Sequence, residues 1–180
     1  MSDSDSATRK TTVPAPPASL ILSTPVHLLA YGFGSGCAPV APGTFGTLLG
    51  IPLFLALCWL DWPAYLLVTG LLFVAGCWIC GESAHLLKLH DAPGIVFDEI
   101  VGYLVAATPL LPVFGLAEAW PLWAQLLAAF VLFRIFDILK PWPIRWLDRR
   151  VHGGFGIMVD DLLAGVFAAL PLWAALHVFG

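Results

Sequence analysis

Long apolar stretches alternate with short polar interruptions from Gly43 to the end of the chain. A barrel would show roughly ten-residue segments of alternating character, which this sequence lacks. The apolar stretches instead have about the 17–25 residues that a membrane-spanning helix requires. They are Gly43–Leu60, Pro63–Cys80, Ile95–Val113, Ala119–Leu139 and Ile157–Phe179. The pattern predicts an all-α fold, an integral membrane helical bundle of about five spanning helices.

Two of these stretches are less regular than the others. Pro52 interrupts the first stretch, and Asp98 and Glu99 lie inside the third. A bundle of four spans, with one of these two stretches re-entrant, is therefore the alternative. Residues 1–24 are rich in Ser, Thr, Pro and Asp, which is typical of disorder, so we expect a disordered tail. Residues 25–180 are predicted to form one membrane-embedded domain.

The composition agrees with a membrane protein. Hydrophobic residues make up 59% of the chain and charged residues 11%, against roughly 45–50% and about 25% in soluble domains. Cys77 and Cys80 form a C-x-x-C pair, but no second Cys or His pair stands nearby to complete a zinc site. A soluble domain and a structural zinc protein are both disfavoured. We expect no nucleic-acid partner, and the sequence leaves the oligomeric state open.

The basic residues predict the orientation of the bundle. With five spans, the loops at Asp61-Trp62 and Phe114–Glu118 share one side, and neither contains Lys or Arg. Every basic residue falls on or near the other side, namely Arg9, Lys10, Lys88, Arg134, Lys140, Arg145, Arg149 and Arg150. The positive-inside rule assigns that side to the cytoplasm. The amino terminus is therefore predicted to be cytoplasmic.

Five acidic residues are expected to converge at this cytoplasmic boundary. Asp98 and Glu99 open the third stretch, Asp137 closes the fourth, and Asp160 and Asp161 open the fifth. A charge at the centre of a spanning helix costs about 2.5–3.5 kcal/mol on insertion scales. Helix-dipole contacts and ion pairs are the alternative explanation for any single acid. Five acids together need a compensating cation, and carboxylate oxygens suit Mg²⁺, so all five are candidate catalytic residues and metal ligands.

Candidate phosphate ligands lie close to these acids. Arg134, Asp137 and Lys140 recur every three residues and share one helix face. An ordinary Arg–Asp pair is the alternative, but Arg and Lys are also suited to phosphate oxygens. The segment GFGSGCAPVAPGT ends at Thr44, and its backbone amides are suited to cradling a phosphate. Ser35 and Thr44 within it are candidate hydroxyl ligands.

Four motifs carry a resemblance to a known family. They are HLLAYGFGSGCAPVAPGTFGTL from His27, GIVFDEIVG from Gly94, FRIFDILKPWPIRWLDRRVHGG from Phe133, and GIMVDDLLAG from Gly156. The chain resembles the phosphatidylglycerophosphatase A family of membrane lipid phosphatases. The resemblance implies Mg²⁺-dependent hydrolysis of phosphatidylglycerophosphate to phosphatidylglycerol, with the site at the cytoplasmic face of the bacterial inner membrane. It implies site roles for Asp98, Glu99, Asp137, Lys140, Asp148, Asp160 and Asp161.

The expected chemistry is attack on the phosphorus of an anionic phospholipid in the bilayer. One or two Mg²⁺ ions would activate a water, while Arg134 and Lys140 neutralise charge on the phosphate oxygens; a covalent aspartyl phosphate is the alternative route. A proton-coupled transporter is a competing function, but its charges would lie near the bilayer midplane. A scaffold that binds anionic lipid through the Arg145–Arg150 cluster is another, and it leaves the five acids unexplained.

Overall fold

The computed structural model describes residues 16–89, 94–115 and 120–179, which are helical and contain no strand. The α-helices are α1 (Ala18–Ser23), α2 (Pro25–Ala30), α3 (Pro42–Leu57), α4 (Trp62–Leu87), α5 (Phe97–Ala106), α6 (Leu122–Leu139), α7 (Ile144–Asp148) and α8 (Gly153–Phe179). Three 3₁₀ segments accompany them, η1 (Gly32–Cys37), η2 (Thr108–Leu110) and η3 (Pro112–Phe114). The predicted all-α class is confirmed.

Three helices, α4, α6 and α8, are long and apolar enough to cross a membrane. Their 26, 18 and 27 residues correspond to about 39, 27 and 40 Å of helix, against a hydrocarbon core of about 30 Å. Their outer surfaces are apolar. On α4, for example, Leu67, Leu71 and Val74 are each at least 60% exposed. A soluble protein would not present such a surface to water, so the helices indicate membrane association.

The first and third predicted spans differ most from the observed helices. The first corresponds to α3, whose 16 residues reach only about 24 Å. The third corresponds to the ten-residue α5 followed by η2 and η3, because Pro109 and Pro112 cannot continue an α-helix. Helix length therefore supports three spans, and the count of five stays a prediction.

Two further boundaries differ from the sequence prediction. Ala18–Ser23 form α1 and Ile21 is fully buried, so ordered structure begins before Pro25; the remainder of the predicted tail, residues 1–15, lies outside the described residues. Helix α8 begins at Gly153 rather than Ile157. Asp160 and Asp161 therefore lie about two turns inside the helix. The helix dipole acts mainly on the first turn, so it does not account for these two acids.

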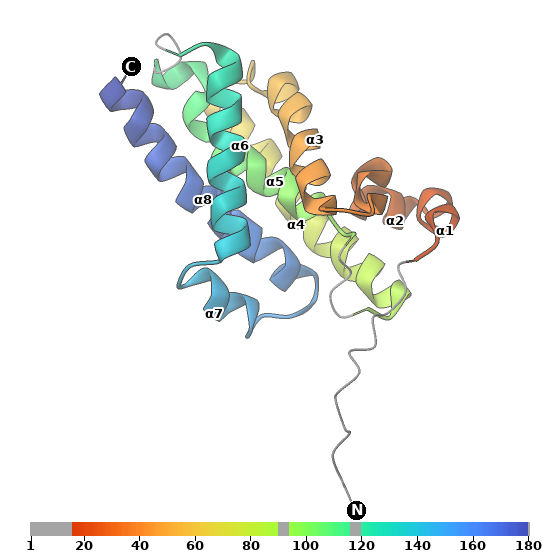
Figure 1. Cartoon of the computed structure of the whole chain (residues 1–180). Coiled ribbons are helices and arrows are strands. Elements are labelled where there is room, and N and C mark those ends of the chain that lie inside the picture. Colours follow the sequence, from red (N-terminus) through yellow and green to blue (C-terminus); the bar gives the residue numbers. More distant parts are fainter. Residues whose placement is uncertain (1–15, 90–93, 116–119, 180) are drawn as a thin grey trace, which may run out of the picture.

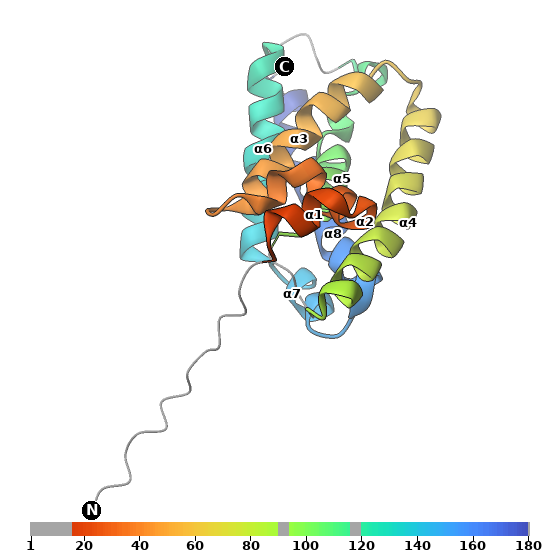
Figure 2. The same cartoon turned by 90° about the vertical axis from the view of Figure 1, so that its right-hand side faces the viewer.

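Helix α5 lies at the centre of the bundle and packs against α3, α4, α6 and α8; it is enclosed by them in both views (Figures 1 and 2). Close contact between α5 and α8 depends on glycine. A Cβ at Gly102 would lie 2.8 Å from the backbone oxygen of Asp161, and one at Gly165 would lie 2.5 Å from that of Gly102. Small residues of this kind let helix backbones approach closely in membranes. The contact brings the first turn of α5 beside Asp161.

The helix ends predicted to converge do lie together at one end of the bundle. Helix α7, the carboxyl end of α6 and the amino-terminal part of α8 meet there. The carboxyl end of α8 lies at the opposite end of the bundle (Figure 1). The short α7 is anchored against α8 by Ile144, which is fully buried. This end of the bundle holds the charged residues discussed next.

Candidate active site

A cavity of about 220 Å³ opens between α5, α6, α7 and α8. It is lined by Ile95, Asp98, Glu99, Asp137, Lys140, Asp148, Val151, His152, Gly153, Gly156, Ile157, Asp160 and Asp161. The lining includes all five acids that the sequence indicated, drawn from three helices far apart in the chain. The structure therefore shows the predicted convergence of the five acids. Within the cavity the acids form separate groups.

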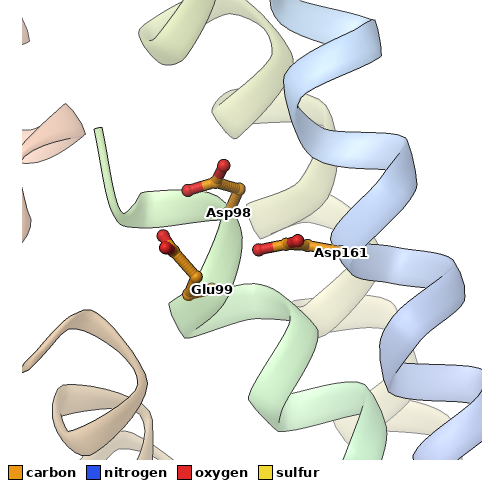
Figure 3. Close-up of side chains that lie close together, drawn as sticks. All are labelled: Asp98, Glu99 and Asp161. Atoms are coloured by element: carbon orange, nitrogen blue, oxygen red, sulfur yellow. The ribbon is translucent and has the colours of Figure 1, made fainter. Parts of the chain in front are cut away.

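The most compact group consists of Asp98, Glu99 and Asp161, here called the carboxylate trio (Figure 3). Asp98 and Glu99 stand in the first turn of α5, and Asp161 reaches across from α8. One oxygen from each carboxylate lies within 4.8 Å of the others. Each residue also has a buried oxygen without a hydrogen-bond partner among the described residues, namely Asp98 Oδ1, Glu99 Oε2 and Asp161 Oδ2. Buried carboxylate oxygens left in this way can accept a cation.

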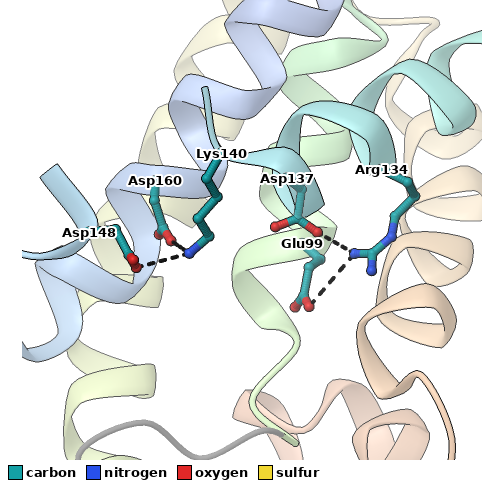
Figure 4. A network of polar contacts seen from close by, with 6 residues as sticks. All are labelled: Glu99, Arg134, Asp137, Lys140, Asp148 and Asp160. Carbon is teal, nitrogen blue, oxygen red and sulfur yellow. Dashed lines mark hydrogen bonds and ion pairs between the residues drawn. The ribbon is translucent and has the colours of Figure 1, made fainter. Parts of the chain in front are cut away.

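Arg134 lies beside Asp137 and Glu99 (Figure 4). Its guanidinium donates to Asp137 Oδ2 at 2.5 Å, and the same nitrogen lies 4.0 Å from Glu99 Oε1. Arg134 is absent from the residues that line the cavity. The α3 backbone seals this side, since a Cβ at Gly43 would collide with Glu99 and approach Arg134. Arg134 is therefore placed to hold two carboxylates in position, as the Arg–Asp alternative proposed.

Lys140 occupies the opposite side of the cavity (Figure 4). Its ammonium donates to Asp160, and it donates to Asp148 Oδ1 at 2.9 Å. Lys140 follows the last residue of α6 with φ +40°, which turns the chain toward α7. Burial alone would lower the pKa of Lys140, but hydrogen bonds and charge attraction from Asp160 and Asp148 outweigh it and raise the pKa above its usual value. The ammonium therefore stays charged at neutral pH.

The structure places the remaining candidates differently. Ser35 and Thr44 do not line the cavity. Ser35, in η1, donates through its Oγ to the Tyr31 backbone oxygen at 3.4 Å, and Thr44 lies in the first turn of α3. His152 also lines the cavity, although a lone His in a sequence is more often structural. The only sequence signal for it is the glycine-rich run VHGGFG, which places it shortly before Asp160 and Asp161.

The cavity holds more negative than positive groups. Six carboxylates line it, those of Asp98, Glu99, Asp137, Asp148, Asp160 and Asp161, whereas Lys140 is the one Lys or Arg among the lining residues. Arg134 adds a second cation nearby. Such an excess is costly in a buried setting unless cations compensate it. Fold and site together define a helical, membrane-associated protein with a polyanionic cavity suited to a divalent metal and a phosphate group.

Comparison with known proteins identifies the family. A family model described as "Phosphatidylglycerophosphatase A" matches residues 28–176. The chain therefore belongs to the phosphatidylglycerophosphatase A family and is a phosphatase, a phosphoric monoester hydrolase. The matched segment includes every residue that lines the cavity. No solved structure matches the chain significantly.

Three relatives cover most of this chain and most of their own length. Phosphatidylglycerophosphatase A from Escherichia coli (strain K12) is 45% identical over 88% of this chain and 87% of the relative. The Haemophilus influenzae protein of the same name is 44% identical, over 85% and 90%. A "putative phosphatidylinositol-3-phosphatase" from Bacteroides thetaiotaomicron is 40% identical, over 85% and 94%. All three names describe lipid monoester phosphatases.

Proposed function

We propose that this protein hydrolyses phosphatidylglycerophosphate to phosphatidylglycerol and phosphate, in a Mg²⁺-dependent reaction of phospholipid biosynthesis. The observation that carries the proposal is the carboxylate trio, whose oxygens lie within 4.8 Å of one another in a cavity that Lys140 also lines. The names of two relatives supply the substrate. A lipid substrate also agrees with the apolar outer surface of the helices, since the substrate can enter from the bilayer.

The donor set fits Mg²⁺ better than a softer metal. All candidate ligands are carboxylate oxygens, which hard cations prefer, and neither Cys nor a second His joins them among the described lining residues. Asp98, Glu99 and Asp161 would hold the ion, and Asp137 and Asp160 line the same cavity. When bound, Mg²⁺ would supply positive charge against the phosphate oxygens and activate water.

The side chains around the trio have separable tasks. Lys140, held by Asp160 and Asp148, presents a fixed ammonium to the cavity and can donate to a phosphate oxygen as a point charge. Arg134 holds Asp137 and Glu99 from outside the cavity. Phosphoryl transfer depends mainly on positioning and on stabilising charge. Lys140 would stabilise charge on the phosphate, and Arg134 positions two of the carboxylates.

We further propose that the cavity faces the cytoplasm at the bacterial inner membrane. Lys140, Arg145, Arg149 and Arg150 all lie between α6 and α8, at the end of the bundle that carries the cavity. Clusters of Lys and Arg of this kind are typical of cytoplasmic loops. A substrate made in the inner leaflet would then reach the site without crossing the membrane.

The test is phosphate release from phosphatidylglycerophosphate by the purified protein in detergent. We expect release with Mg²⁺, loss of activity with EDTA, and recovery when excess Mg²⁺ is restored. Phosphatidylinositol 3-phosphate belongs in the same assay because of the name of the third relative. Turnover that persists in EDTA would exclude the metal, and preference for the inositol lipid would replace the substrate assignment.

Replacing Arg134 by glutamine is expected to lower activity by about 10–100-fold, the range found for residues that orient metal ligands. The variant removes the guanidinium that donates to Asp137 and weakens the charge attraction that keeps Glu99 in place. We expect the Mg²⁺ concentration for half-maximal activity to rise, because the ligands are no longer held in place. If the substrate KM rises instead at unchanged Mg²⁺ dependence, Arg134 contacts phosphate, as the sequence first indicated.

A further inference from the structure

A second cavity, of about 560 Å³, lies beside the first, between the end of α6 and α7. It is lined by Leu139, Lys140, Pro141, Trp142, Arg145, Trp146, Arg149 and Arg150. Three arginines and two tryptophans thus surround it, and none of its lining residues is acidic. We call it the arginine–tryptophan pocket. Its charge is opposite to that of the acidic cavity.

The arginines of this pocket are available to a ligand. Arg149 and Arg150 are exposed, and neither forms an ion pair within the described part of the chain. Arg150 lies over the Trp146 ring, 4.5 Å from its centre, and Arg145 donates to the Leu139 backbone oxygen at 3.1 Å. These contacts orient the side chains without neutralising them. Guanidinium groups bind phosphate oxygens with two parallel hydrogen bonds.

The tryptophans place the pocket at the level of lipid headgroups. Trp142 is 81% exposed and Trp146 is 47% exposed, whereas Ile144 between them is fully buried and fixes α7 to the bundle. Exposed Trp side chains of membrane proteins concentrate at the membrane–water interface. Arginines in the same layer meet the phosphates of anionic lipids.

The two cavities share a wall. Lys140 lines both, and α7 contributes Asp148 to the acidic cavity while its Arg145 and Trp146 line the other. A molecule carrying a phosphodiester next to a terminal phosphate monoester can therefore occupy both at once. Under the proposed function, the acidic cavity would hold Mg²⁺ and take the monoester, and the negatively charged diester would fit the arginines.

We propose that the arginine–tryptophan pocket binds the phosphodiester of an anionic phospholipid. The inference rests on the proposed function for its natural occupant, the diester of the substrate itself. A neighbouring anionic lipid presents the same chemistry. The pocket would then distinguish phosphatidylglycerophosphate from lipid monoesters that lack a diester, and Arg149 and Arg150 would be determinants of specificity.

Kinetics in neutral detergent micelles test this proposal with two substrates. Phosphatidylglycerophosphate contains both groups, and phosphatidate contains only a monoester. For Arg149→Gln or Arg150→Gln, we expect the ratio of the KM for the first to the KM for the second to rise about fivefold, the effect of one basic residue near a lipid phosphate. Lys88→Gln, which removes an exposed basic residue outside the pocket, is the control and should leave the ratio unchanged.

The source of the diester is distinguished by adding phosphatidylglycerol to the micelles. If a neighbouring lipid occupies the pocket, added phosphatidylglycerol stimulates hydrolysis of both substrates, and the arginine variants lose that stimulation. Equal KM values for variants and parent on both substrates, without any change in stimulation, would overturn the proposal. A uniform loss on both substrates, independent of added lipid, would overturn it as well.

Direct binding separates this proposal from the assigned activity. Dansyl-labelled phosphatidylglycerol, followed by energy transfer from tryptophan, reports lipid binding without turnover, and the arginine variants assign the share of that binding that depends on the pocket. Binding should weaken about fivefold in Arg149→Gln and Arg150→Gln and not in Lys88→Gln. A parent protein that hydrolyses no lipid but shows this pattern would refute the proposed function alone. Hydrolysis by a parent protein whose arginine variants bind normally would refute the pocket alone.

Discussion

Asp161→Asn is expected to lower turnover on the order of a thousandfold, because it replaces one member of the carboxylate trio. A metal supplies several kcal/mol of charge stabilisation in a transition state, and about 4 kcal/mol corresponds to a thousandfold in rate. Asp161 is the buried member of the trio, 3% exposed, and the only one supplied by α8. Asparagine preserves its size and removes its charge.

The thermal stability of Asp161→Asn, in contrast to its turnover, should not fall. Three carboxylates within 4.8 Å repel one another, and Asp161 Oδ2 lacks a hydrogen-bond partner among the described residues. Removing one charge relieves this repulsion, so the metal-free variant should unfold at the same temperature as the parent or higher. A gain in stability with a loss of activity is characteristic of functional sites.

Asp61→Asn provides the matched control. Asp61 precedes α4, and its side chain accepts from the Ala64 backbone N–H as a helix cap, a role that asparagine retains. The measurements are phosphate release at saturating substrate and thermal unfolding in detergent. Asp61→Asn should match the parent in both. An Asp161→Asn protein that is folded and keeps more than about a tenth of the parent turnover would remove Asp161 from the ligand set.

Hydropathy and charge were sufficient to predict the helical class and the meeting of distant acids. The acids stand near the ends of apolar stretches. If each stretch crosses the membrane once, the start of the third, the end of the fourth and the start of the fifth lie on the same side. Asp98, Asp137 and Asp160 were brought together by that reasoning, without side-chain detail. The grouping within the cavity was not predictable, because it depends on helix rotation and side-chain conformation. Arg134, for example, was predicted to share a helix face with Lys140, but Lys140 lies beyond the last residue of α6. Arg134 pairs instead with Asp137 and lies near Glu99.

Glycine explains the wrong boundary of α8. The sequence VHGGFG resembles a loop, since glycine favours turns in water-soluble proteins. In the structure Gly154 lies inside the helix, where a Cβ would collide with the Cys77 backbone oxygen of α4. Glycine here permits helix contact, as is common in membranes. Local sequence does not distinguish the two uses, because the difference lies in the partner helix.

The contact between α5 and α8 at Gly102 brings the trio together. Gly102→Ala should both destabilise the protein and lower its turnover. The added Cβ would lie 2.6 Å from the Phe133 ring and 2.8 Å from the Asp161 backbone oxygen. Such overpacking typically costs about 1–3 kcal/mol, which exceeds the roughly 0.5–1 kcal/mol that alanine contributes to a helix over glycine.

The loss of turnover follows from the elements that meet at Gly102. Helix α5 carries Asp98 and Glu99, and α8 carries Asp161, so separating the two helices widens the trio. A displacement of about 1 Å at a catalytic group can cost a hundredfold in rate. We therefore expect about a hundredfold loss in phosphate release and a lower unfolding temperature in detergent.

Gly70→Ala is the control for this prediction, because Gly70 also lies in a helix, α4, but a Cβ there meets nothing within 4 Å. It should leave turnover unchanged and raise the unfolding temperature slightly through helix propensity alone. If Gly102→Ala behaves in the same way as Gly70→Ala, the α5–α8 contact does not set the spacing of the trio. If only Gly102→Ala loses both stability and turnover, helix packing in this bundle determines the geometry of its acidic site.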